Sequence, residues 1–222
     1  MEPGSGSRSA LGQAALELAA RDALMAELWR RFGEPLRGRL GFDPGRAGPL
    51  CELDAFGVVA EVVVYQQLSA AAARSIVERL ERRGALRAEG FSSLGRDERA
   101  ELGLSQAKLR ALEELARAVL EGRLDLERLG ELDDRAARSW LLGFRGIGPW
   151  TADMVLLFHL DRLDVWPTGD AALRRAVVRR FGPTIDPNAL GERWRPWRSL
   201  AALWLWQDDH QAWRSGLRAS AP

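Results

Sequence analysis

The most informative residues of this 222-residue chain read Leu142-Gly143-Phe144-Arg145-Gly146-Ile147-Gly148-Pro149-Trp150-Thr151-Ala152. Two glycines flank Ile147, and glycine allows a positive φ and leaves no side chain between the backbone and a ligand. A helix that starts at Thr151 exposes its first N–H groups, which bind anions. The stretch therefore predicts a tight turn, anchored by Ile147, that can hold a phosphate. A Gly-X-Gly pattern alone is equally compatible with an ordinary helix-turn-helix corner.

The composition narrows the class of protein. Hydrophobic residues make up 46% and charged residues 28%, as in ordinary globular domains. No apolar run reaches the length of about 18 residues that a membrane span needs, and residues 1–7 read as a flexible tail without an apolar signal core. The single cysteine, Cys51, cannot form an internal disulfide and fits a reducing cytoplasm. The net charge of +1 does not by itself indicate nucleic acid, although Lys108 is the only lysine among mostly arginine cations.

Helical spacing dominates the chain and no strand hairpin is evident, so the predicted fold class is all-α. The valine-rich run within 58–64 also fits a buried strand, but its length and flanking Ala and Glu residues favour a helix. Ser69, Ser105 and Asp133 or Asp134 are predicted helix N-caps. The expected helices cover residues 9–32, 53–66, 69–83, 105–121, 134–143, 151–161, 170–182, 187–194 and 198–217.

One carboxylate stands out in the sequence that follows the glycine turn around Ile147. Asp170 follows Pro167-Thr168-Gly169 and precedes an expected helix. The plain interpretation is a helix N-cap, for which aspartate is favoured. The other interpretation is a catalytic carboxylate held at a helix start, close in sequence to a phosphate-binding turn.

The wider context of the turn is more specific. Together with Asp170 it resembles the helix-hairpin-helix DNA glycosylase superfamily, and most of all the alkylation-repair branch of the 3-methyladenine DNA glycosylase II type. The resemblance covers about Leu53 to Trp206. Three further stretches support it in the right order: Val64-Tyr65-Gln66-Gln67-Leu68-Ser69, Leu102-Gly103-Leu104-Ser105-Gln106-Ala107-Lys108, and Trp194-Arg195-Pro196-Trp197-Arg198-Ser199-Leu200-Ala201-Ala202-Leu203-Trp204-Leu205-Trp206.

The resemblance implies a two-lobed helical fold. Residues 1–52 would form a helix and connection that pack on the C-terminal lobe, and residues 53–165 a central lobe with the helix-hairpin-helix at about 139–161. Residues 166–222 would complete the second lobe, with an active-site cleft between the lobes. The segment before Leu53 is too short and too helical for the N-terminal β-domain that some members carry.

The resemblance also assigns the hairpin a role toward DNA. It implies that a phosphate is held by the backbone N–H groups of Gly146, Gly148 and Thr151. It implies that the carbonyls of Leu142, Phe144 and Ile147 hold a structural Na⁺ or K⁺. No other cofactor is required.

Asp170 would then be the catalytic residue. Cleavage of an N-glycosidic bond builds positive charge on the sugar, which a nearby carboxylate stabilises. Alkylated purines leave readily because they already carry positive charge, so no general acid is needed. Relatives that also cut the backbone use a lysine near the end of the hairpin as a nucleophile. The matching position is Trp150, so we expect a monofunctional glycosylase.

A base in a duplex must be flipped into a pocket before it can react. The resemblance places Trp150 and Trp206 in that pocket, with Met154 and Tyr65 beside them, and core packing is the alternative for each tryptophan. The turn after Tyr65 is expected to enter the minor groove, where Gln67 or Leu68 fills the vacated space. The alternative is a helix corner with Leu68 buried. Arg198 is expected to brace the Asp170 helix rather than to touch substrate.

The sequence therefore predicts a monofunctional glycosylase that excises alkylated purines from double-stranded DNA during base excision repair. A glycosylase for another damaged or mismatched base is one alternative, and a non-catalytic helix-hairpin-helix DNA-binding module is another. The expected protein is a monomer without membrane contact, located in the cytoplasm and associated with the nucleoid.

Overall fold

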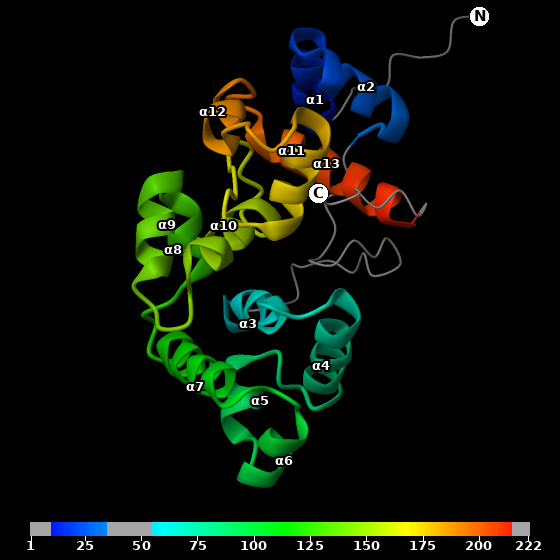
Figure 1. The fold of residues 1–222 in the computed structure, drawn as a ribbon. Coiled ribbons are helices and arrows are strands. Elements are labelled where there is room, and N and C mark those ends of the chain that lie inside the picture. The colour runs from blue at the N-terminus through cyan, green and yellow to red at the C-terminus, as the bar shows by residue number, and fades with distance from the viewer. Residues whose placement is uncertain (1–9, 35–54, 215–222) are drawn as a thin grey trace, which may run out of the picture. The chain divides into compact units, whose positions relative to one another are not determined.

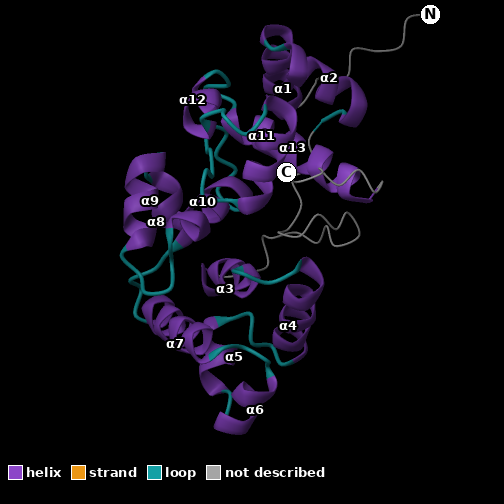
Figure 2. Ribbon diagram, viewed as in Figure 1, coloured by secondary structure: helices purple, strands orange, loops and turns teal. Residues whose placement is uncertain are grey.

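The computed structural model describes residues 10–34 and 55–214, and every regular element in these ranges is a helix (Figure 1, Figure 2). The all-α prediction is therefore confirmed. No helix of the described part has the length and apolar character that crossing a membrane requires. The helices are α1 (Ala10–Arg21), α2 (Ala23–Phe32), α3 (Ala55–Tyr65), α4 (Ala70–Arg82), α5 (Ala88–Ser93), α6 (Arg96–Glu101), α7 (Gln106–Leu120), α8 (Leu126–Glu131), α9 (Asp134–Leu142), α10 (Pro149–Phe158), α11 (Ala171–Phe181), α12 (Pro187–Glu192) and α13 (Arg198–Arg214).

The chain divides into two compact units, and the first combines both ends of the sequence, residues 1–37 and 163–222. Within it α2 and α11 both pack against α13. The apolar centre contains Trp194 and Trp204, both completely buried, and Trp29 of α2 meets Trp204 edge to face with ring centroids 6.1 Å apart. Large aromatic side chains dominate the burial energy of a core, so at least these tryptophans serve packing.

A buried carboxylate also joins the helices of the first unit. Asp208 of α13 is 1% exposed and accepts hydrogen bonds from Arg31 of α2 at 2.6 Å, from Arg180 of α11 at 2.6 and 2.7 Å, and from Arg179. Burial by itself would raise the pKa of Asp208, but the hydrogen bonds and charges of Arg180 and Arg179 outweigh it and hold this pKa below its ordinary value. Such a carboxylate is tolerated inside a protein because it is paired.

The second unit, residues 38–162, is built around α3. Residues 55–64 of this helix are all buried, because α4, α7 and α10 pack around it. A helix that is apolar on every side belongs in a core, and the helical interpretation of the valine run is thus confirmed over the strand. Phe56 and Phe91 pack against each other at the contact between α3 and α5, with ring centroids 5.2 Å apart and ring planes tilted by 42°.

The prediction of one helix over 9–32 is wrong at Asp22. This residue has an extended backbone, and its carboxylate caps α2 by accepting from the amides of Leu24 and Met25 at 3.0 and 3.2 Å. The other carboxylate oxygen accepts from the indole of Trp194 at 3.0 Å and from Arg193 at 3.2 Å. A contact with a residue about 170 positions away therefore fixes a break that spacing alone does not indicate.

Further boundaries differ from the predictions. Helices α5, α6 and α8 are only six residues each and were not predicted, because so short a segment carries too little periodicity. The α10 helix begins at Pro149, two residues before the predicted start at Thr151. Proline is favoured at a first helical position because its missing N–H would make no helical bond there. The predicted N-caps Ser69, Ser105 and Asp133 are confirmed by their side-chain hydrogen bonds to the following amides.

Candidate functional site

The glycine turn connects α9 and α10 as a hairpin of the second unit. It closes through a hydrogen bond from the Ile147 amide to the Phe144 carbonyl, 3.1 Å long. Phe144 and Ile147 are 8% and 5% exposed, so the predicted anchoring role of Ile147 is confirmed. The backbone of the intervening residues is held against the protein by these two apolar side chains, while Arg145 is exposed.

The two glycines of the turn serve different purposes. Gly146 has φ +87°, and a Cβ built on it would lie 2.4 Å from the Cβ of Ala111 on α7. The protein itself therefore requires glycine at this position. Gly148 has φ −90°, and a Cβ on it would meet no atom within 4 Å. Neither the conformation nor the internal packing requires glycine there, and the absent side chain leaves space outside the protein.

The start of α10 has the features of an anion site. Gly148 is its N-cap and provides no side chain to cap the helix. The first helical hydrogen bond runs from the Ala152 amide to the Gly148 carbonyl at 3.0 Å. The amides of Trp150 and Thr151 thus belong to the first turn, whose N–H groups have no acceptor within the helix and carry the positive end of its dipole.

The turn after α3 lies against this hairpin through a residue that the sequence analysis missed. The Nε2 amide of Gln66 donates to the carbonyl of Gly146 at 2.9 Å and to Oγ1 of Thr151 at 2.8 Å. The only sign of this role in the sequence is a polar residue directly after a helix that is apolar apart from Glu61. Gln67, the next residue, is exposed with φ +56°, and Leu68 is 39% exposed. The alternative with Leu68 buried in a helix corner is therefore wrong.

Lys108 of α7 holds the same turn from its other side. Its Nζ donates to the carbonyls of Val64 and Gln66 at 2.8 and 2.7 Å. Partial burial lowers the pKa of this lysine. Both carbonyls belong to the C-terminal end of α3 or follow it directly, where backbone oxygens lack helical partners and a cation is favoured.

The sequence analysis also missed a buried carboxylate within the helix-hairpin-helix. Asp153 of α10 is 7% exposed and accepts from Nε of Arg138 on α9 at 2.6 Å. Burial raises the pKa of Asp153, and the hydrogen bond and charge of Arg138 oppose this rise. The pair joins the two helices on either side of the hairpin, which gives it a structural role.

Asp170 belongs to the first unit and is the N-cap of α11. Its Oδ1 accepts from the Leu173 amide at 2.6 Å and from the indole Nε1 of Trp206 at 2.9 Å. The N-cap interpretation is therefore confirmed, and it does not exclude the catalytic one, since a capping carboxylate keeps its negative charge. Trp206 is 4% exposed. Of the predicted pocket residues, the structure brings Trp206 into direct contact with Asp170.

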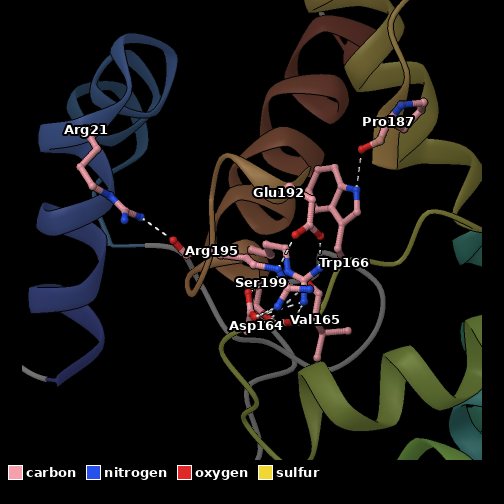
Figure 3. Close-up of polar contacts among 9 residues, drawn as sticks. Arg21, Asp164, Val165, Trp166, Pro187, Glu192, Arg195 and Ser199 are labelled. Carbon is pink, nitrogen blue, oxygen red and sulfur yellow. Dashed lines mark hydrogen bonds and ion pairs between the residues drawn. The ribbon is translucent and has the colours of Figure 1, made fainter. Parts of the chain in front are cut away.

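An ionic cluster fixes the loop that leads to Asp170 (Figure 3). Arg198, the first residue of α13, donates to the Asp164 carboxylate at 2.7 and 3.1 Å and to its backbone carbonyl at 2.8 Å. Arg195 donates to the same carboxylate at 2.8 Å, and its own carbonyl accepts from Arg21 at 2.9 Å. Glu192 pairs with both Arg195 and Arg198. Arg198 thus braces the loop before Asp170 rather than α11 itself.

Neutral contacts continue this support toward Asp170 (Figure 3). The buried Ser199 donates its amide to Leu163 at 3.0 Å and accepts from the Val165 amide on Oγ at 3.0 Å. The indole of Trp166 donates to the Pro187 carbonyl at 2.9 Å and lies so close to Gly191 that a Cβ there would approach it to 2.6 Å. Helix α13 therefore positions Asp170 in two ways. Its first residues hold the loop that precedes Asp170, and Trp206 farther along the helix donates to the Asp170 carboxylate.

The remaining predicted pocket residues belong to the second unit. Tyr65 and Trp150 are partly exposed, and Met154 is 1% exposed in the interior of α10. No group of three or more His, Cys, Asp or Glu side chains suited to a metal ion occurs in residues 10–34 or 55–214.

Two curated proteins are similar to this chain over most of its length. The YfjP protein of Bacillus subtilis is 28% identical over 166 residues, which are 68% of this chain and 58% of that protein. DNA-3-methyladenine glycosylase 2 of Escherichia coli is 32% identical over 188 residues, 78% of this chain and 64% of that protein. The chain thus spans less than two thirds of the length of these curated relatives.

A solved structure shares the fold over nearly its full length. The DNA-3-methyladenine glycosidase of Bacillus halodurans superposes with a TM-score of 0.70 at 27% identity, covering 90% of this chain and 91% of that one. The model of the HhH-GPD superfamily of base excision DNA repair proteins matches residues 60–196, which include the turn after α3, the hairpin and Asp170. The chain belongs to the HhH-GPD superfamily of base excision DNA repair proteins.

Proposed function

We propose that this protein is a monofunctional DNA glycosylase that removes alkylated purines such as 3-methyladenine and 7-methylguanine from double-stranded DNA. The family supports a role in base excision repair, and the named relatives support alkylated bases as its substrates. The observation that carries the proposal is the Asp170 carboxylate, which is held at the start of α11 by the Leu173 amide and the Trp206 indole.

In the proposed reaction the bond between C1′ of the deoxyribose and the base nitrogen breaks, and its electron pair leaves with the base. An alkylated purine is cationic, so it becomes neutral as it departs and requires no proton donor. Positive charge develops on the sugar, where a fixed carboxylate stabilises it electrostatically. Water then adds to C1′ and loses a proton, which leaves an abasic site. The firm support of Asp170 suits this role, because a preorganised charge stabilises a transition state best.

The hairpin would supply the grip on DNA. The amides of Gly146, Gly148 and Thr151 would donate to one phosphate, with the positive end of the α10 dipole beside it. Such contacts fix the position of the duplex without reading its sequence. The open space around Gly148 supports this proposal, since a phosphate can approach the main chain there.

The absence of a lyase step is part of the proposal. Trp150 stands where the related lyases have their lysine, and an indole cannot form a Schiff base with the sugar aldehyde. Lys108, the only lysine of the chain, donates from Nζ to two carbonyls below the turn after α3. Those bonds assign it to holding the turn.

A monovalent cation at the hairpin would fit the groups that are present. Leu142 ends α9, so its carbonyl lies in a final turn whose oxygens have no partner within the helix. The Phe144 carbonyl accepts only the 3.1 Å turn hydrogen bond among the described backbone contacts. With the Ile147 carbonyl these would form an all-oxygen donor set, which would suit Na⁺ or K⁺. When bound, the ion would supply positive charge next to the phosphate, and Asp170 requires no metal for its role.

The test separates base release from strand cleavage. Duplexes with 7-methylguanine, 3-methyladenine, 8-oxoguanine or uracil are incubated with the protein, and free base and nicks are measured separately. We expect release of the alkylated bases without nicking. Release of 8-oxoguanine or uracil alone would favour a different substrate class. Nicking without added alkali would contradict a monofunctional enzyme, and binding without any release would favour a DNA-binding module.

Substitution of the carboxylate tests the mechanism. Asp170→Asn removes the negative charge but keeps an oxygen that can cap α11, so we expect the single-turnover excision rate to fall by roughly 100- to 1,000-fold with folding and DNA binding retained. Asp186→Asn is the matched control, because Asp186 caps α12 in the same unit by accepting from the Asn188 amide at 2.9 Å. A near-normal excision rate for Asp170→Asn would refute the assignment.

A further inference from the structure

We propose that Gln66 is a positioning residue that ties the turn after α3 to the DNA-binding hairpin, so that both enter DNA as one rigid piece. The proposal rests on the proposed function in one respect, namely that the exposed residues Gln67 and Leu68 enter the space of the flipped nucleotide. It assigns a function to a side chain that does not itself need to touch DNA.

The bonds of Gln66 reach both ends of the phosphate-binding segment. An amide nitrogen carries two hydrogens, and Nε2 uses them for the Gly146 carbonyl and for Oγ1 of Thr151. These two acceptors come before and after Gly148. Thr151 is 1% exposed, so its hydroxyl is fixed by packing. The Gln66 side chain thus bridges the turn of the hairpin and the first turn of α10.

Helix α7 supports both segments from a single face. Lys108 binds the carbonyls of Val64 and Gln66, while Ala111, one helical turn later, contacts Gly146 closely enough to exclude any side chain there. Residues three apart on a helix lie on the same face. Both the turn after α3 and the hairpin are therefore held by α7, and Gln66 connects the two segments to each other.

The conformation of Gln67 shows why such support is needed. Its φ of +56° lies in the left-handed region, which a residue other than glycine holds only when its surroundings impose it. Gln66 is fixed by its side chain on the hairpin and by its carbonyl on Lys108. Without these bonds Gln67 can relax to a negative φ, which redirects its side chain and that of Leu68. The position of the Gln67 and Leu68 side chains thus depends on the hairpin that is proposed to bind a phosphate of the DNA strand.

The experiment compares Gln66→Ala with the wild-type protein in three measurements. These are the single-turnover excision of 7-methylguanine, the dissociation constant for an undamaged duplex, and the fluorescence of 2-aminopurine placed next to an abasic analogue. We expect Gln66→Ala to excise roughly 10- to 100-fold more slowly, as a misplaced group does, while the undamaged duplex binds as in the wild type. The 2-aminopurine signal should fall because the neighbouring bases remain stacked.

Two further variants guard this result. Gln106→Ala is the matched control, since Gln106 is an exposed glutamine at the start of α7 and should behave as the wild type. Gln66→Met keeps the length of the side chain and adds no charge beside the phosphate, but it has no N–H to donate, so it should reproduce the effect if Gln66→Ala unfolds. A wild-type excision rate in Gln66→Met or Gln66→Ala would overturn the proposal.

A double-mutant cycle separates positioning from general stability. If Gln66 acts through the turn, Gln66→Ala adds little to the slower of Gln67→Ala and Leu68→Ala, because contacting residues in one pathway are not additive. Full multiplication of both effects would overturn the proposal. If the wild-type protein releases no base, the proposed function fails, yet the 2-aminopurine signal still tests the positioning role. An unchanged signal in Gln66→Ala would then refute it.

Discussion

The hairpin and the loop before Asp170 are held by different kinds of interaction. The turn between α9 and α10 depends on backbone geometry, on the amide of Gln66 and on the close contact of Gly146 with Ala111, whereas the Arg138–Asp153 ion pair joins the two flanking helices. The loop depends on ionised side chains, with Asp164 bound by Arg195 (Figure 3) and also by Arg198. The helix that follows Asp170 is likewise attached to α13 through the arginines on Asp208.

The difference follows from what each region is proposed to bind. Main-chain donors suit a phosphate site, whereas a fixed carboxylate at that spot would repel the ligand. The Asp170 region instead has to keep one carboxylate in place, and ionic contacts made by rigid, bidentate arginines are directional. Neutral support therefore suits the region that approaches phosphate, and ionic support suits the region that positions a charge.

The largest effect is expected when the ion pairs that attach α2 and α11 to α13 are broken at Asp208. Asp208→Ala leaves the guanidinium groups of Arg31, Arg179 and Arg180 without their shared carboxylate. Loss of one partner from a buried ion pair costs roughly 3–5 kcal/mol, so we expect the melting temperature to fall by roughly 10 °C or more. Differential scanning calorimetry measures this.

Two comparisons make the Asp208 prediction specific. Asp209→Ala should cost less, because Asp209 forms longer contacts with Arg175 and Arg179 at 3.3 and 3.7 Å. The folded-state pKa of Asp208 lies below its ordinary value of 3.8, so its contribution is present above pH 3.8 and is lost as the pH falls through the lowered pKa. The wild type should therefore lose more stability than Asp208→Ala on acidification. Equal loss in both would contradict the role of this carboxylate.

A smaller loss of stability is expected at the neutral hairpin. Gly146→Ala forces a side chain into the left-handed region and toward Ala111. Strain of about 1–2 kcal/mol and overpacking of about 1–3 kcal/mol together predict a destabilisation of roughly 2–5 kcal/mol. Chemical denaturation followed by circular dichroism checks this value. A stability equal to that of the wild type would show that the hairpin is not seated on α7 as described.

The smallest effect sharpens the comparison within the hairpin itself. Gly148→Ala places a methyl group in open space at an ordinary φ, so the stability should stay within about 0.5 kcal/mol of the wild type. The methyl group would, however, obstruct a phosphate, and we expect the dissociation constant for any duplex to rise about tenfold, which is the loss of one charge-assisted hydrogen bond. Fluorescence anisotropy with two unrelated sequences measures it. Unchanged affinity would remove Gly148 from the DNA interface.

Local features of the sequence could be interpreted reliably. The caps at Ser69, Ser105, Asp133 and Asp170 were predicted because a capping bond spans only two or three residues. The buried position of Ile147 followed from its place as the apolar residue between the two glycines of the turn. The short helices α5, α6 and α8 and the break at Asp22 were missed, since these three helices lack periodicity and the break depends on Trp194.

The sequence alone was sufficient to predict the all-helical class, the hairpin with its backbone amides, and the Asp170 carboxylate at a helix start. This was possible because the hydrophobic period, helix caps and glycine turns act over a few residues. Only the tertiary structure decided which groups support them. That Gln66 binds Gly146 and Thr151, that Lys108 binds the turn after α3, and that Trp206 binds Asp170 depends on residues 36 to 85 positions apart. Such contacts arise from how helices pack, and helix packing is a property of the whole fold rather than of any local pattern.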